Sequence, residues 1–100
     1  MSLSPFQIVV ASVSAGGAYQ ATLVSVPAGT RTVTLYTAVA DVHLGDNLDA
    51  AGVVVTDAHR FPVLPDGLNE LDLSGFGPGG AVVRLCAGTP ATEVRLLCQR

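Results

Sequence analysis

Short stretches rich in Val, Thr and Leu follow one another along the chain, and Gly, Pro, Asp or Asn stands in almost every gap. Apolar and polar positions alternate with a period of two, most clearly in Arg31–Thr37, where we expect Val33 and Leu35 to point inward. No stretch has helical spacing of apolar residues over the length of a helix. The expected strands are Phe6–Ser14, Tyr19–Val26, Arg31–Thr37, Val42–Leu44, Gly52–Thr56, Arg60–Leu64, Asn69–Leu73, Ala81–Ala87 and Thr92–Cys98.

This spacing of strands and turns predicts an all-β fold: one antiparallel β-sandwich of about eight strands over residues 1–100, jelly-roll or immunoglobulin-like in topology. Pro62 cannot donate a hydrogen bond to a neighbouring strand, so Arg60–Leu64 is expected to be an edge strand or an extended segment. Three consecutive valines, 53–55, suggest a strand that is buried on both faces. The Pro65-Asp66-Gly67 sequence predicts a turn in which the glycine takes the left-handed conformation.

The last two strands are expected to form a hairpin closed by residues 88–91, with Val83, Leu85, Val94 and Leu96 facing inward. That register sets Arg84 opposite Arg95, so either the register shifts or a carboxylate from a partner lies there. It also directs the thiols of Cys86 and Cys98 to opposite sides, and we therefore expect free cysteines.

Composition adds a constraint on the surface of the folded protein. Charged residues make up 13% of the chain and hydrophobic residues 49%, with a mean hydropathy of +0.50, against about 25% charged residues in an average soluble domain. No apolar run approaches the ~18 residues of a spanning helix, so we expect the surplus apolar surface to be covered by oligomerisation rather than by a membrane. The net charge of −3 and the scattered arginines argue against nucleic acid. The N-terminal residues lack the features of a secretory signal, which predicts synthesis in the cytoplasm.

Candidate chemistry is sparse. Asp41, His43 and His59 would be a ligand set that zinc accepts if the strands around them lie close together. Asp and Asn are also the residues that hydrogen-bond turn backbones, which is the ordinary explanation of this polar stretch. The order of residues matches no known metal loop, and we expect no metal and no cofactor.

Catalysis is not expected. Ser, His and Asp are present, but there is no nucleophile elbow and no strand-turn-helix context to hold one. The glycine-rich residues 74–80 lack the lysine and the helix that a phosphate cradle needs, so they are interpreted as a loop. The carboxylates Glu70, Asp72 and Glu93 are expected on outward strand faces.

The order of several segments resembles the small β-sandwich virion proteins encoded among the structural genes of tailed bacteriophages. The similar segments are Val-Pro-Ala-Gly-Thr (26–30), Arg-Thr-Val-Thr-Leu (31–35), Asp-Val-His-Leu-Gly-Asp (41–46), Phe-Pro-Val-Leu-Pro-Asp-Gly (61–67), Glu-Leu-Asp-Leu (70–73) and the stretch 84–97. Together they cover roughly residues 20–98 and form a pattern of segments rather than an invariant motif. The chain departs from such proteins in its two cysteines, which no decoration role requires, and in its short N-terminus, which offers little arm to bind a neighbour.

The resemblance implies a non-enzymatic structural protein of the virion, made in the host cytoplasm. A capsid decoration or head-accessory protein is the leading expectation: a homo-oligomer, with a trimer favoured, that binds the major capsid protein or another virion protein and cements the shell. The contact residues expected from exposure are Phe61, Val63, Phe76, Arg84 and Arg95. The alternative is a recognition module of a phage fibre, in which the loops 45–50 and 74–80 bind a receptor glycan or a calcium ion.

Overall fold

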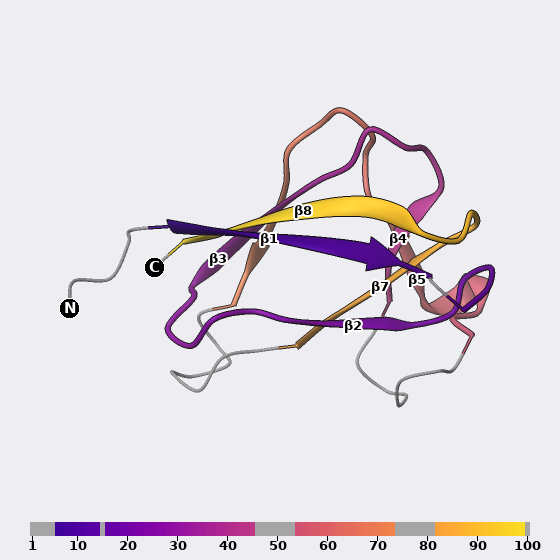
Figure 1. The fold of residues 1–100 in the computed structure, drawn as a ribbon, viewed down its shortest axis with the longest axis horizontal. Helices are drawn as coiled ribbons and strands as arrows, with labels where there is room; N and C mark the ends of the chain where they lie inside the picture. The colour runs from indigo at the N-terminus through magenta and orange to yellow at the C-terminus, as the bar shows by residue number, and fades with distance from the viewer. Residues whose placement is uncertain (1–5, 15, 46–53, 74–81, 100) are drawn as a thin grey trace.

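The computed structural model describes residues 6–14, 16–45, 54–73 and 82–99, which form two four-stranded antiparallel sheets packed face to face (Figure 1). The first sheet has the order β1-β8-β3-β6 and the second has the order β2-β7-β4-β5. The expected all-β sandwich of about eight strands is confirmed. The strands are β1 (Phe6–Val13), β2 (Thr22–Ser25), β3 (Thr32–Tyr36), β4 (Val42–Gly45), β5 (Arg60–Pro62), β6 (Asn69–Asp72), β7 (Val82–Ala87) and β8 (Thr92–Gln99).

The strand pairs are nested along the chain. β1 pairs with β8, β2 with β7, β3 with β6 and β4 with β5, and every pair is antiparallel. Further pairs join β3 to β8 and β4 to β7, which completes the two sheets. Most consecutive strands therefore lie in opposite sheets and do not form hairpins with each other.

The expected closing hairpin is wrong, because β7 and β8 belong to different sheets. The connection over residues 88–91 crosses between the sheets, with Ala91 in the left-handed conformation (φ 60°). Arg84 lies opposite Leu23 and Gly45, while Arg95 lies opposite Val10 and Tyr36. The two arginines never face each other, so the like-charge conflict of the hairpin register does not arise.

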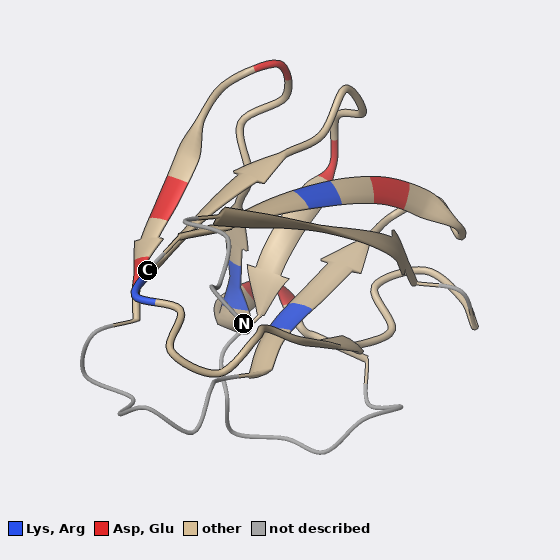
Figure 2. Ribbon diagram, turned by 60° about the vertical axis from the view of Figure 1, so that its left-hand side comes forward, with Lys and Arg blue, Asp and Glu red and all other residues tan. Residues whose placement is uncertain are grey.

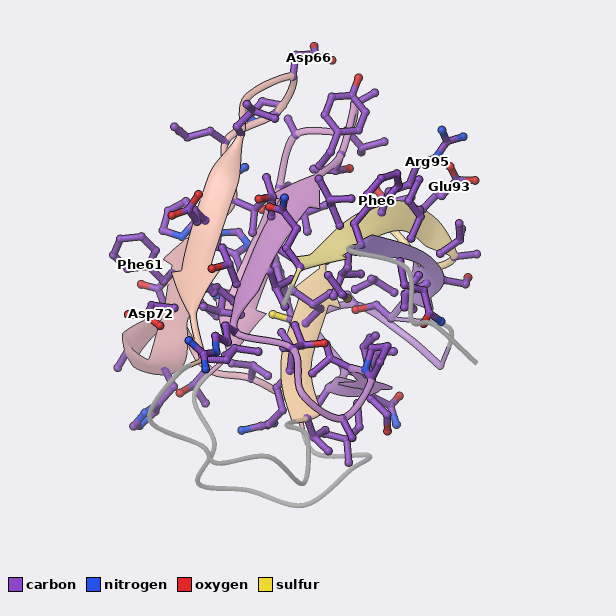
Figure 3. The ribbon with its side chains drawn as sticks, turned by 90° about the vertical axis from the view of Figure 1, so that its left-hand side faces the viewer. Phe6, Phe61, Asp66, Asp72, Glu93 and Arg95 are labelled. Atoms are coloured by element: carbon purple, nitrogen blue, oxygen red, sulfur yellow. The ribbon has the colours of Figure 1, made fainter. Side chains whose placement is uncertain are left out.

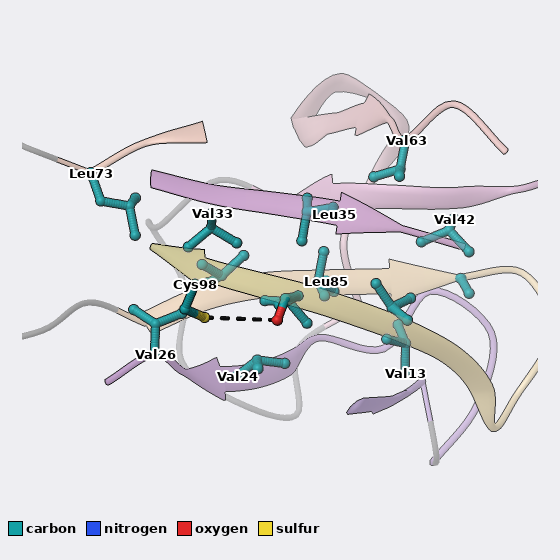
Figure 4. Close-up of a cluster of buried hydrophobic side chains, with 14 residues drawn as sticks. Val13, Val24, Val26, Val33, Leu35, Val42, Val63, Leu73, Leu85 and Cys98 are labelled. Atoms are coloured by element: carbon teal, nitrogen blue, oxygen red, sulfur yellow. Dashed lines mark hydrogen bonds between the residues drawn. The ribbon is translucent and has the colours of Figure 1, made fainter. Parts of the chain in front are cut away.

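The inner faces of the two sheets meet in one hydrophobic core (Figure 4). The period-two alternation correctly identified the inward side chains: Val33 and Leu35 are at most 1% exposed, and Glu70 and Asp72 point to solvent. Both cysteines are free, as expected, and Cys98 contributes to this core. The buried core residues are Val13, Val24, Val26, Val33, Leu35, Val42, Val63, Leu73, Val83, Leu85, Ala87, Val94, Leu96 and Cys98.

Buried Ser14 ties three strands together at one end of the sandwich. Its hydroxyl accepts a hydrogen bond from the backbone N–H of Ala87 at 2.7 Å and donates to the carbonyl of Gln20 at 3.0 Å. Its own backbone N–H donates to the hydroxyl of Thr22 at 2.8 Å. Because β1 and β7 lie in opposite sheets, these bonds hold the two layers in register.

Several expected strands are shorter in the structure, and two of them differ most. Tyr19 has a φ of 57°, outside the strand region, and β2 begins only at Thr22. Of the expected Gly52–Thr56 strand, the described part makes an isolated bridge between Val54 and Gln20. Val54 is 56% exposed and Val55 is 2% exposed, so burial on both faces is wrong for Val54. This segment lies outside the second sheet and can turn only one face toward it; Val53 is outside the described residues.

The turn at residues 65–67 also differs from expectation in one detail. Asp66, with a φ of 57°, takes the left-handed conformation instead of Gly67. Asn69 organises this turn, since its side chain accepts a hydrogen bond from the N–H of Leu64 and donates to the carbonyls of Leu64 and Leu35. The expected edge position of Pro62 is confirmed, because β5 is the outermost strand of the second sheet. Over the part of the chain that is described, no helix has the length and apolar character needed to cross a membrane.

Candidate functional site

The residues expected to make protein contacts differ in their exposure to solvent. Phe61, on the edge strand β5, is 72% exposed. Arg95 points away from the first sheet beside Glu93, and its Nε lies 2.9 Å from a Glu93 carboxylate oxygen (Figure 3). Val63 is 4% and Arg84 is 2% exposed, so the expectation of exposure is wrong for both. Phe76 lies outside the described residues.

The burial of Val63 and Arg84 has a clear structural cause in each case. The backbone N–H of Val63 donates to the carbonyl of Val42 at 2.9 Å. This bond fixes Val63 beside β4, and its side chain packs in the core. Arg84 lies on the outer face of the second sheet next to Gly45. The side chain of Val55 covers that glycine, at 3.3 Å from the place where a Cβ would be. A face that strand alternation marks as outward is thus covered by another part of the chain.

The same covering layer contains a cluster of polar side chains in mutual contact. We call it the Tyr19 cluster; it comprises Tyr19, Asp41, His43 and Arg60 on the outer face of the second sheet. The Tyr19 hydroxyl donates to Asp41 at 2.5 Å. The guanidinium carbon of Arg60 lies 3.8 Å from the centre of the Tyr19 ring, and the His43 ring meets the same ring edge-on at 5.7 Å.

Sequence reasoning had placed Asp41 and His43 in one candidate site with His59. The structure does bring Asp41 and His43 together, with 3.7 Å between a carboxylate oxygen and Nδ1. His59 is exposed in the short 3-10 turn Asp57–His59 and does not join them. Within the described ranges, no group of three His, Cys, Asp or Glu side chains could hold a metal ion. The converging zinc set is therefore wrong for these three residues; Asp46, Asn47 and Asp49 are outside the described part.

Two groups of the Tyr19 cluster have a raised pKa, the Tyr19 phenol and the Arg60 guanidinium. The hydrogen bond to Asp41 raises the pKa of Tyr19, with desolvation as the next cause, so the phenol holds its proton more tightly. The hydrogen bond to Asp57 at 2.8 Å raises the pKa of Arg60 and keeps the guanidinium charged. Burial raises the pKa of Cys86, which lies beneath Tyr19, Ala21 and Val55 at 0% exposure. A protonated phenol, a fixed cation and a covered thiol stabilise this layer and supply no nucleophile.

Sequence reasoning did not identify the row of exposed apolar side chains on β1 as a candidate contact surface. On β1, Phe6, Ile8 and Val10 are 51%, 58% and 60% exposed and share the outer face of the first sheet. Half-buried Leu97 of β8 lies directly opposite Ile8. The signal was present in the chain: Phe6–Ser14 is apolar on both faces and carries no charge, although only one face can belong to the core.

Charged side chains surround this apolar row without entering it. Figure 2 shows no charged residue on β1, whereas β6 at the opposite edge of the first sheet carries two carboxylates and the turn before it carries Asp66. Phe6 and Phe61 lie on opposite sides of the sandwich (Figure 3). The exposed apolar residues of β1 and the exposed Phe61 of β5 are therefore separate from each other.

No protein family model, curated protein or solved structure matches this chain.

Proposed function

We propose that this protein is a structural component of a phage virion, of the capsid decoration or head-accessory type, which acts by protein–protein contacts and not by catalysis. The observation that carries the proposal is the exposed apolar surface. Eleven large hydrophobic side chains among the described residues are at least 40% exposed, in a chain with 13% charged residues. Apolar surface of this kind is typical of proteins that bind neighbours.

The nested strand order gives the proposal further support. The orders β1-β8-β3-β6 and β2-β7-β4-β5 are those of an eight-stranded jelly roll, an architecture used by viral capsid domains and also by lectins and cupins. An immunoglobulin sandwich instead hydrogen-bonds its first two strands in one sheet. We therefore propose a jelly-roll topology. A shared architecture alone does not carry a function, so the exposed surface remains the main support.

The mechanism in this proposal is multivalent cementing of a shell. An oligomer that engages several equivalent sites at once converts the later binding steps into intramolecular ones, so weak contacts add up to stable attachment. Phe61 and Arg95 remain the proposed contact residues, since both side chains are exposed. Val63 and Arg84 are not proposed as contact residues, because both are buried.

Co-sedimentation of the purified protein with empty heads of the phage that encodes it tests the proposal. We expect saturable binding, and Phe61→Asp should weaken it more than Leu68→Asp, a matched change at another exposed apolar residue (82% exposed). Absence of binding to heads would contradict the decoration role. A melting temperature that rises on addition of calcium would favour the recognition-module alternative instead.

A further inference from the structure

The four edge strands of the sandwich differ in how well they resist pairing with another strand. Natural sheets protect their edges with short strands, charged side chains, proline or bulges. β6 has four residues, two of them acidic; β5 has three residues and ends in Pro62; and β2 has only four. β1 is the exception, because it has eight residues without charge or proline and pairs with β8 in an unbroken register from Phe6 to Val13.

The outer face of β1 adds side-chain contacts to this open backbone edge. Phe6, Ile8 and Val10 alternate along the strand and leave more than half of each side chain in solvent. Eight residues at ~3.4 Å per residue give an edge of about 27 Å. Among the described strands, β8 alone is hydrogen-bonded to β1, so the other side of its backbone is open to a further strand.

We propose that β1 pairs antiparallel with β1 of a second copy of this chain, which joins the two first sheets into one continuous eight-stranded sheet. The inference deepens the self-association in the proposed function and rests on it, but it does not require the virion role. A two-fold pair is self-complementary, since each copy presents the same edge and the same apolar row to the other.

The side chains favour a register centred on Ile8. Residues directly opposite each other in an antiparallel pair lie on the same face. In this register Ile8 faces Ile8 of the second copy, and Phe6 faces Val10 twice, so every contact of the outer row is apolar. Leu97 of each copy flanks the central pair, because it lies opposite Ile8 in β8.

The charges near β1 are compatible with this arrangement. Arg95 lies opposite Val10 and Glu93 lies opposite Ser12, and the two form an ion pair with each other at 2.9 Å. In the register centred on Ile8, the ion pairs of the two copies lie at opposite ends of the joined strands. No like charges are brought together, and no charge is buried without its partner.

Analytical ultracentrifugation of the full chain over a micromolar concentration range tests the inference. We expect a monomer–dimer equilibrium that Ile8→Lys weakens by about 100-fold, because the register sets the two lysine charges directly opposite each other on the paired edge. Leu64→Lys, at a residue that is 63% exposed away from β1, should leave it unchanged. Circular dichroism melting confirms that both variants are folded, as the exposure of both residues leads us to expect.

A conservative variant keeps the test decisive if Ile8→Lys fails to fold. Ile8→Cys places two thiols across the two-fold axis at about the Cβ separation of cross-strand pairs, so mild oxidation should produce a covalent dimer, whereas Leu64→Cys should not. A trimer would overturn β1 pairing, and so would an oligomer that Ile8→Lys leaves intact. In either case the self-association in the proposed function would still hold. A monomer throughout would overturn both, and binding to phage heads then decides separately on the virion role.

Discussion

Truncation of Leu35 to alanine tests the packing of the core most directly. Leu35 is 1% exposed in β3, an inner strand with β6 on one side and β8 on the other. Its side chain points across the sandwich toward Leu85 of the second sheet (Figure 4). The change removes all carbon atoms beyond Cβ and leaves a cavity between the two sheets. β3 is hydrogen-bonded to a neighbouring strand on each edge.

The expected loss follows from transfer and cavity terms. At about 0.8 kcal/mol for each buried methylene-sized group, the lost transfer free energy is about 2.4 kcal/mol. A cavity term adds to it, because strands that are paired on both edges cannot move in to fill the space. We expect a decrease of about 3–4 kcal/mol in the free energy of unfolding, which is a large part of the ~5–15 kcal/mol of a typical domain. The melting temperature should fall by about 12–30 °C.

Urea unfolding followed by circular dichroism measures this loss. Protein concentration must be held constant, since self-association adds to the apparent stability. Leu64→Ala is the matched control, because the same atoms are removed from a side chain that is 63% exposed, and we expect a change within about 0.5 kcal/mol. If the two variants shifted the unfolding midpoint equally, the assignment of Leu35 to the core would be refuted.

Three further outcomes follow from the hydrogen bonds and burial. Ser14→Ala removes the acceptor of the buried Ala87 N–H and the hydroxyl that donates to the Gln20 carbonyl, and it should lower the free energy of unfolding by about 2 kcal/mol; an effect no larger than that of exposed Ser12→Ala would contradict it. The raised pKa of Tyr19 contributes stability that is complete below the ordinary value of 10.0 and is lost as pH rises through the folded value. In a Tyr36→Phe background, Asp41→Ala removes the acceptor of the Tyr19 hydroxyl and should lower the tyrosinate midpoint toward 10.0 by ultraviolet titration, and an unchanged midpoint would refute the hydrogen bond to Asp41 as the cause of the raised pKa. Both buried thiols should react with a thiol reagent only as fast as the protein unfolds, so immediate labelling of the folded protein would contradict their burial.

The sequence predicted the candidate site only in part. Phe61 was correctly expected at the surface, and Asp41 and His43 do lie together. The expected exposure of Arg84 was wrong because residues 54–55, about 30 positions earlier, cover its side of the second sheet. The apolar row of β1 was visible as a pattern, but its position at a sheet edge was not.

The inward and outward positions of strands with clear alternation, such as β3, were determined by the sequence alone. Successive side chains of a strand point to opposite faces, so the alternation at Val33 and Leu35 is a local property of the backbone and was correct. The partner of each strand, the burial of Arg84 and the open edge of β1 were decided only by the tertiary structure. These features depend on contacts between residues far apart in the chain. No short window of sequence contains both sides of such a contact, as the assignment of β7 and β8 to opposite sheets demonstrates.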